Sequence, residues 1–106
     1  MELANAARAF SALSNEGRLA IFRLIVRAGP RGLPSGEVAR RAGKVPNSAS
    51  SSLRILAEAG LIVARRQGRS VIYAAVEGNL PKLLEALTVR AEGEAAHAEA
   101  RPGPRG

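Results

Sequence analysis

The chain has 106 residues, no cysteine, and 16 Lys and Arg against 9 Asp and Glu, which gives a formal net charge of +7. This length predicts one small domain, and the absence of cysteine excludes a disulfide framework, a thiolate metal site and a cysteine nucleophile. No apolar run approaches the roughly 18 residues that a membrane span requires, and the N-terminus lacks the features of a signal peptide. The sequence therefore predicts a cytoplasmic protein with no membrane partner.

The positive charge is concentrated in the middle of the chain. Between residues 23 and 69, ten Lys and Arg stand against only Glu37 and Glu58, whereas the segments on either side are close to neutral. Such a block is typical of a surface that binds a polyanion. A generic solvated surface is the alternative that charge alone leaves open.

The spacing of apolar residues in the first half of the chain predicts helices over residues 3–13, 16–28, 36–42 and 46–59. Ser14 or Asn15 is expected to cap the second helix and Ser35 the third, while Pro46 suits the first position of the fourth. The second helix is apolar around most of its circumference, which predicts that it is the buried centre of the domain.

Two segments rich in β-forming residues follow, Leu61–Ala64 and Val71–Ala74, and they bracket a polar stretch that contains Gly68. This pattern predicts an antiparallel hairpin. A last helix is expected to begin near Asn79 and to reach about Ala91. Residues 1–92 are thus predicted to form the domain, and residues 93–106, which contain no large apolar side chain, a flexible or disordered tail.

The predicted fold class is mainly α with a small β-hairpin, in which two short helices joined at residues 42–45 form a helix-turn-helix and the hairpin forms a wing. The serines of the fourth helix favour DNA, because they are poor helix formers and their short hydroxyl side chains allow close approach. A small-residue face packed on protein is the alternative. The predicted contacts are Arg40, Arg41 and Lys44 at phosphates, Asn47, Ser48, Ser51, Ser52 and Arg54 at the groove, and Arg65, Arg66 and Arg69 on the wing.

These segments resemble the ArsR/SmtB family of bacterial repressors. The stretch Ala12–Ile21 is similar to the opening helices of the family, residues 46–48 and 53–62 to its recognition helix and exit, and residues 65–73 to its wing. The resemblance covers about residues 3–87. It implies a homodimer that binds an imperfect palindrome of double-stranded DNA and represses transcription until an effector releases it.

The resemblance also implies that the first and last helices form the dimer interface. Additional burial is expected on physical grounds, because alanine supplies 21 of the apolar residues and leaves a thin core. An ordinary intramolecular core would have the same periodicity. The residues predicted for the interface are Leu3, Phe10, Leu80, Leu83, Leu84 and Leu87.

The sequence departs from the family at the positions that sense metals. Pro34 and Gly36 stand where many members carry cysteines, and the single histidine, His97, falls in the predicted tail. A tetrahedral site needs about four N, S or O ligands, so no metal or other cofactor is expected. Any effector is expected to be an unidentified non-metal small molecule. Relatives commonly carry larger residues where Ser51 and Ser52 stand, which leaves the operator sequence open.

No catalytic constellation is present, because a serine nucleophile needs a positioned base and His97 has no core to hold it. The chain is therefore not expected to be an enzyme. Two alternatives to the DNA-binding regulator remain open from the sequence. One is a protein-interaction module with an acidic partner, and the other is a nonspecific nucleic-acid-binding protein, with RNA disfavoured by the scarcity of exposed aromatic residues.

Overall fold

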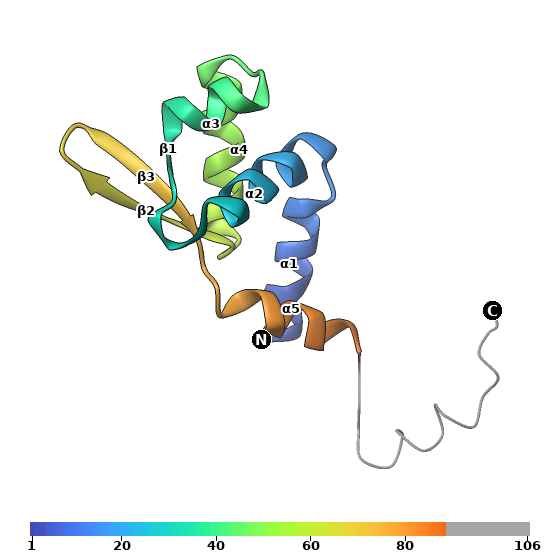
Figure 1. Ribbon diagram of the computed structural model, residues 1–106. Coiled ribbons are helices and arrows are strands. Elements are labelled where there is room, and N and C mark those ends of the chain that lie inside the picture. Colours follow the sequence, from blue (N-terminus) through green and yellow to red (C-terminus); the bar gives the residue numbers. More distant parts are fainter. Residues whose placement is uncertain (89–106) are drawn as a thin grey trace, which may run out of the picture.

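The computed structural model describes residues 1–88, in which the helices pack together and a small three-stranded sheet lies at one side of them (Figure 1). Hairpin β2–β3 extends away from the helices as a wing, and α5 lies beside α1 at the end of the molecule opposite α3. The mainly helical winged helix-turn-helix predicted from the sequence is thereby confirmed. In chain order the elements are α1 (Leu3–Leu13), α2 (Glu16–Ala28), the 3-10 turn η1 (Gly29–Arg31), β1 (Leu33–Pro34), α3 (Ser35–Ala42), α4 (Pro46–Glu58), β2 (Ile62–Gln67), β3 (Ser70–Ala75) and α5 (Asn79–Leu87).

The corner between α1 and α2 is held by two side chains. Asn15 is the N-cap of α2 and accepts a hydrogen bond from the backbone N–H of Arg18, as the sequence predicts. The Arg18 side chain returns toward α1, where its Nε donates to the carbonyl oxygen of Ala12 at 2.7 Å. Both bonds satisfy backbone groups at helix ends that would otherwise need water.

The core lies between α2, α4 and the sheet, with the small side chains of α1 packed on it. Helix α2 has the central position that its sequence predicts, because it packs against α1, α3, α4 and β3. Ile21, Phe22 and Ile25 are buried, whereas Leu19 and Val26 are exposed on the part of its surface that these elements leave uncovered. The largest fully buried side chains are Ile21, Ile25, Val38, Leu53, Leu56 and Leu61.

The sheet contains a strand that the sequence pattern did not predict. Its order is β1-β3-β2, and β1 pairs antiparallel with β3 through Leu33 opposite Tyr73. Gly32 makes this pairing possible, because its φ of 69° favours glycine and an added Cβ would lie 2.4 Å from the carbonyl oxygen of Tyr73. The strand thus ties the start of α3 to the base of the wing.

Several predicted boundaries shift. Ser35 is the first residue of α3 and makes no capping hydrogen bond, because the preceding Pro34 is the extended residue before the helix. The wing strands are longer than predicted, with a two-residue connection that places Gly68 first, as type II′ turns do. The described part of α5 ends at Leu87, and the predictions for Ala91, for His97 and for a tail over residues 93–106 lie outside the described residues. None of the helices within residues 1–88 combines the length and apolarity that crossing a bilayer demands.

Candidate nucleic-acid interface

The helix-turn-helix is formed by α3 and α4 with a tight turn between them. Gly43 ends α3 in the left-handed conformation, with a φ of 66°. Its N–H donates to the carbonyl oxygen of Arg40 and that of Lys44 to the carbonyl oxygen of Ala39, a pattern common at helix ends that stop at glycine. Pro46 then begins α4. The turn is therefore short, and it fixes the direction in which α4 leaves α3.

The outer face of α4 is polar and open to solvent, whereas Ala49, Leu53 and Leu56 on the other face are buried. Among the predicted groove residues, Asn47, Ser48, Ser51 and Arg54 are exposed and Ser52 is half-buried. The exposed Ser50 was not predicted, although it shares a shallow hollow of about 340 Å³ with Asn47, Ser51 and Arg54. Helical spacing could have identified it, because it lies one turn before Arg54.

The arginines of α3 are held by a carboxylate. Arg40 and Arg41 both form ion pairs with Glu37, and the Nε of Arg41 lies 2.6 Å from Glu37 Oε2. The hydrogen bond from Arg40 is the main cause that lowers the pKa of Glu37, and that of Arg41 adds to it. These ion pairs therefore stabilise the fold at pH values above the ordinary pKa of a carboxyl group. The stabilisation is lost as the pH falls through the lowered pKa of Glu37. The pairs are exposed and leave other guanidinium N–H groups free for a second anion.

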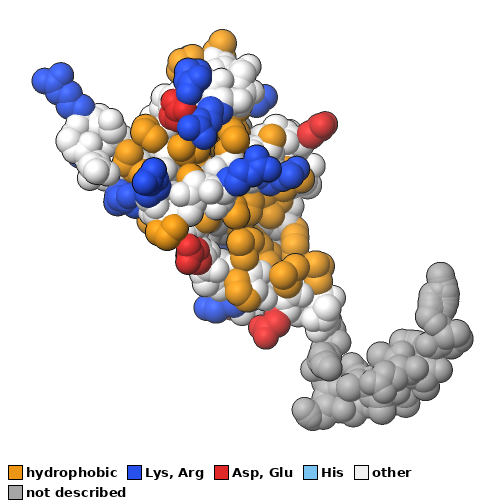
Figure 2. All heavy atoms as spheres, in the orientation of Figure 1, with side chains coloured by type: hydrophobic (Ala, Val, Ile, Leu, Met, Phe, Trp, Pro, Cys, Tyr) orange, Lys and Arg blue, Asp and Glu red, His pale blue; other side chains and the backbone are white. Residues whose placement is uncertain are grey.

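The wing carries its three predicted arginines in two different ways. Arg65 donates from Nη2 to the carbonyl oxygen of Arg31 at 3.0 Å, which ties β2 to η1. Arg66 and Arg69 are exposed, and Arg69 stands in the two-residue turn at the tip. Lys44, in the turn before α4, is half-buried. Figure 2 shows basic side chains on the wing and on the helix-turn-helix.

The leucines predicted for a dimer interface do not share one environment. Leu3, Leu84 and Leu87 are exposed at 80%, 64% and 62%. Phe10 and Leu80 are half-buried against the core. Leu83 is only 3% exposed and belongs to the core of the single chain, so it can add little new area to an interface between two chains.

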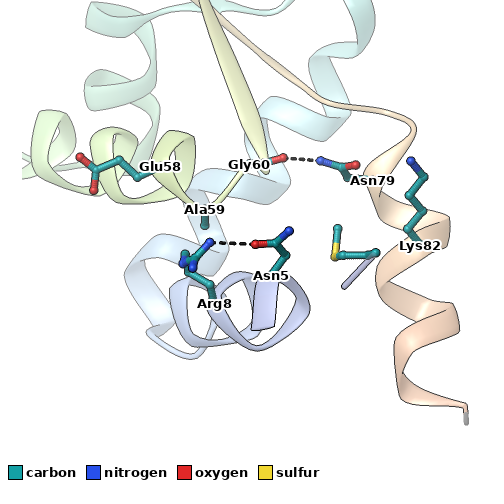
Figure 3. A pocket seen from close by; sticks show the side chains of 8 residues that line it. Asn5, Arg8, Glu58, Ala59, Gly60, Asn79 and Lys82 are labelled. Carbon is teal, nitrogen blue, oxygen red and sulfur yellow. Dashed lines mark hydrogen bonds between the residues drawn. The ribbon is translucent and has the colours of Figure 1, made fainter. Parts of the chain in front are cut away.

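A hollow of about 350 Å³ lies where α1, the end of α4 and α5 meet (Figure 3). Asn79 donates from Nδ2 to the carbonyl oxygen of Gly60 at 2.6 Å, and Arg8 donates from Nη1 to Asn5 Oδ1 at 3.0 Å. Asn5, Arg8 and Asn79 therefore already have hydrogen-bond partners in this hollow, which Glu58 and Lys82 also line. Within residues 1–88, no three His, Asp or Glu side chains gather closely enough to hold a metal ion.

A helix-turn-helix with an exposed polar second helix, a basic wing and no catalytic constellation among the described residues defines a DNA-binding protein of the winged-helix class. The comparisons with known proteins agree with this class. Residues 13–65 match the family model described as "Helix-turn-helix domain".

The chain is 33% identical over 89 residues to the HTH-type transcriptional regulator NmtR of Mycobacterium tuberculosis, an alignment that covers 84% of this chain and 72% of NmtR. It superimposes on an ArsR-like transcriptional regulator from Rhodococcus sp. RHA1 with a TM-score of 0.72 at 28% identity, over 91% of this chain and 82% of that one. A second similar structure, with a TM-score of 0.68 at 26% identity over 93% of this chain and 84% of the other, is the homodimeric winged helix-turn-helix DNA-binding domain of a possible ArsR-family regulator from Mycobacterium bovis. The chain belongs to the ArsR family of helix-turn-helix transcriptional regulators.

Proposed function

We propose that this regulator is a repressor that binds an imperfect DNA palindrome as a homodimer and is released by a non-metal effector. The observation that carries the proposal is the exposed face of α4, where Asn47, Ser51 and Arg54 line one shallow hollow. Side chains of this kind reach base edges in the major groove when a recognition helix lies there. Such a protein acts in the bacterial cytoplasm, where its operator lies.

Arg54 is the best candidate for reading a base, because guanidinium groups make two hydrogen bonds to guanine in the major groove. The serines are better suited to phosphates or to close approach, since a single hydroxyl distinguishes bases poorly. The arginines of the wing tip and of α3 would contact phosphates on either side of the groove that α4 enters. Arg54 would then determine which DNA sequence is bound, and the phosphate contacts would determine how the protein is placed on the duplex.

Dimerisation is proposed through α1 and α5. The exposed leucines Leu3, Leu84 and Leu87 lie on these two neighbouring helices, and an apolar patch of this kind is typical of an interaction surface. The similar Mycobacterium bovis domain is homodimeric, which supports dimerisation of this chain. A second copy would place two α4 helices on one side of the duplex, one for each half of a palindrome.

Fluorescence anisotropy with labelled duplexes tests the proposal. DNA from upstream of the protein's own gene should bind more tightly than a scrambled duplex or RNA of the same length. In the Arg54→Ala variant, the difference in binding free energy between the upstream duplex and the scrambled duplex should shrink by about 1–3 kcal/mol. In the Arg8→Ala variant, with its substitution on α1, this difference should not change. Equal affinity of the native chain for RNA and for both duplexes would favour nonspecific nucleic-acid binding. If the native chain binds none of the three, a protein-interaction module with an acidic partner would be favoured instead.

A further inference from the structure

A second basic surface lies on α2, away from the groove residues of α4. A hollow of about 340 Å³ between α2 and α3 is lined by the arginines Arg23, Arg27 and Arg41 and by the apolar residues Ala20, Leu24 and Ala42. No acidic residue lines it. Figure 2 shows basic side chains over α2 and α3 on the same face of the molecule.

The arginines of this hollow are only partly compensated by acidic side chains. Arg23 and Arg27 are exposed one helical turn apart on α2, and like charges at this spacing destabilise a helix. Neither forms an ion pair with any other residue in the 1–88 range. Arg41 gives its Nε to Glu37, and its remaining N–H groups stay available. Three guanidinium groups therefore line one hollow, and Glu37, the one carboxylate within residues 1–88 that pairs with any of them, does not line it.

We propose that the α2–α3 hollow binds a small organic dianion of the phosphate monoester class. Guanidinium groups form paired hydrogen bonds with phosphate oxygens, and several of them around one cavity match a doubly charged group. The floor formed by Leu24 and the two alanines suits an apolar body next to that group. The volume is at the lower end of the range for small-molecule sites, which fits a ligand about the size of a substituted ring.

The apolar residues that line this hollow next to its arginines favour a small organic molecule over the backbone of bound DNA, which offers no apolar body. The residues that line this hollow are also distinct from those of the α4 hollow. The other candidate for an effector, the hollow between α1 and α5, is less suitable for a dianion because a carboxylate, Glu58, lines it and Arg8 is already bonded to Asn5.

Binding at this site would oppose DNA binding, an inference that rests on the proposed function. Arg41 lines the hollow and is also a predicted phosphate contact of the helix-turn-helix, so the dianion and the DNA backbone compete for one guanidinium group. The added negative charge next to α3 also weakens the attraction of its other basic residues for DNA. Each ligand must then lower the affinity of the other by the same factor.

Isothermal titration calorimetry with phenyl phosphate tests the site in the absence of DNA. The native protein should bind phenyl phosphate saturably, and more tightly than inorganic phosphate at the same ionic strength. The double variant Arg23→Gln/Arg27→Gln should bind it at least about tenfold more weakly, and Arg8→Gln should bind like the native protein. Because these side chains are exposed, circular dichroism should show that all the variants fold. Absence of binding to the native protein, or equal binding by the double variant, overturns the proposal.

Anisotropy with the DNA probe separates this site from the proposed function. Phenyl phosphate should release DNA from the native protein but not from the Arg23→Gln/Arg27→Gln variant. If the native chain binds phenyl phosphate and no DNA, the site stands and the proposed function fails. If the double variant keeps its affinity for phenyl phosphate but loses DNA affinity and part of its salt dependence, the two arginines are phosphate contacts of DNA, and the small-molecule site is overturned.

Discussion

Replacing Arg69 with glutamine should weaken DNA binding and leave the stability of the fold unchanged. Replacing Arg65 with glutamine should lower the stability and leave the salt dependence of DNA binding unchanged. Arg69 stands exposed at the tip of the wing, where it is free to contact a phosphate. Arg65 directs Nη2 to the carbonyl oxygen of Arg31, so it holds the wing in place. The two residues have the same charge and lie four positions apart, which makes each the control for the other.

The number of phosphate contacts determines how steeply the affinity for DNA falls with salt concentration. Each protomer offers five basic side chains for phosphates at the helix-turn-helix and the outer wing, namely Arg40, Arg41, Lys44, Arg66 and Arg69. If a dimer uses all of them, log K should fall with log salt with a slope of about −9, which is a loss of about 10⁵ in affinity between 50 and 200 mM salt. Removing Arg69 from both protomers should change the slope to about −7.

Arg65→Gln should leave the slope close to that of the native protein. It should instead lower the free energy of unfolding by at most about 1 kcal/mol, because the lost hydrogen bond is exposed. Anisotropy titrations at four salt concentrations and a urea denaturation curve for each variant measure both quantities. A slope that changes as much for Arg65→Gln as for Arg69→Gln would refute the assignment of separate roles.

Four further outcomes are expected. Gly32→Ala should destabilise the fold by about 3 kcal/mol or more in urea, because strain and a clash with the Tyr73 carbonyl combine, whereas Gly68→Ala, with a similar φ and open space, should cost about 1 kcal/mol; equal losses would contradict this. Leu84→Glu should weaken the dimer at least about hundredfold by sedimentation, since two carboxylates enter an apolar interface, and an unchanged dimer would place the interface elsewhere. Glu37→Gln should tighten DNA binding about twofold to tenfold at low salt by freeing two arginines, and weaker binding would mean that Glu37 orients them. Micromolar Zn(II), Cd(II) or As(III) should leave operator binding unchanged, because the chain has no thiol and one histidine; saturable release by one of these ions, followed by anisotropy, would contradict this.

The helices were predictable because their information is local. The spacing of Ala49, Leu53 and Leu56 predicts which face of α4 is buried, and the structure confirms it. The same reasoning could not separate Leu83 from Leu84, because both belong to one stripe of leucines. Which of them enters the core depends on how α5 packs on the rest of the chain, and only Leu83 does so.

The parts that could not be predicted depend on contacts between distant segments. Strand β1 has only two residues, one of them proline, and it exists because β3, about forty residues later in the chain, pairs with it. The bond from Arg65 to Arg31 spans 34 positions. The pattern of basic residues therefore indicated a polyanion-binding surface, but not which arginines are engaged within the chain and which remain free.

Sequencing of the duplexes that the protein retains from a random DNA library tests the central claim most directly. A dimer that presents two α4 helices to one side of the duplex should enrich two inverted half-sites whose centres lie about 10–11 base pairs, or a multiple of that distance, apart. The Arg54→Ala variant should lose preference at one position of each half-site and keep the spacing. A library that shows no enrichment, or a single motif without an inverted partner, would contradict the account of a dimeric, sequence-reading regulator.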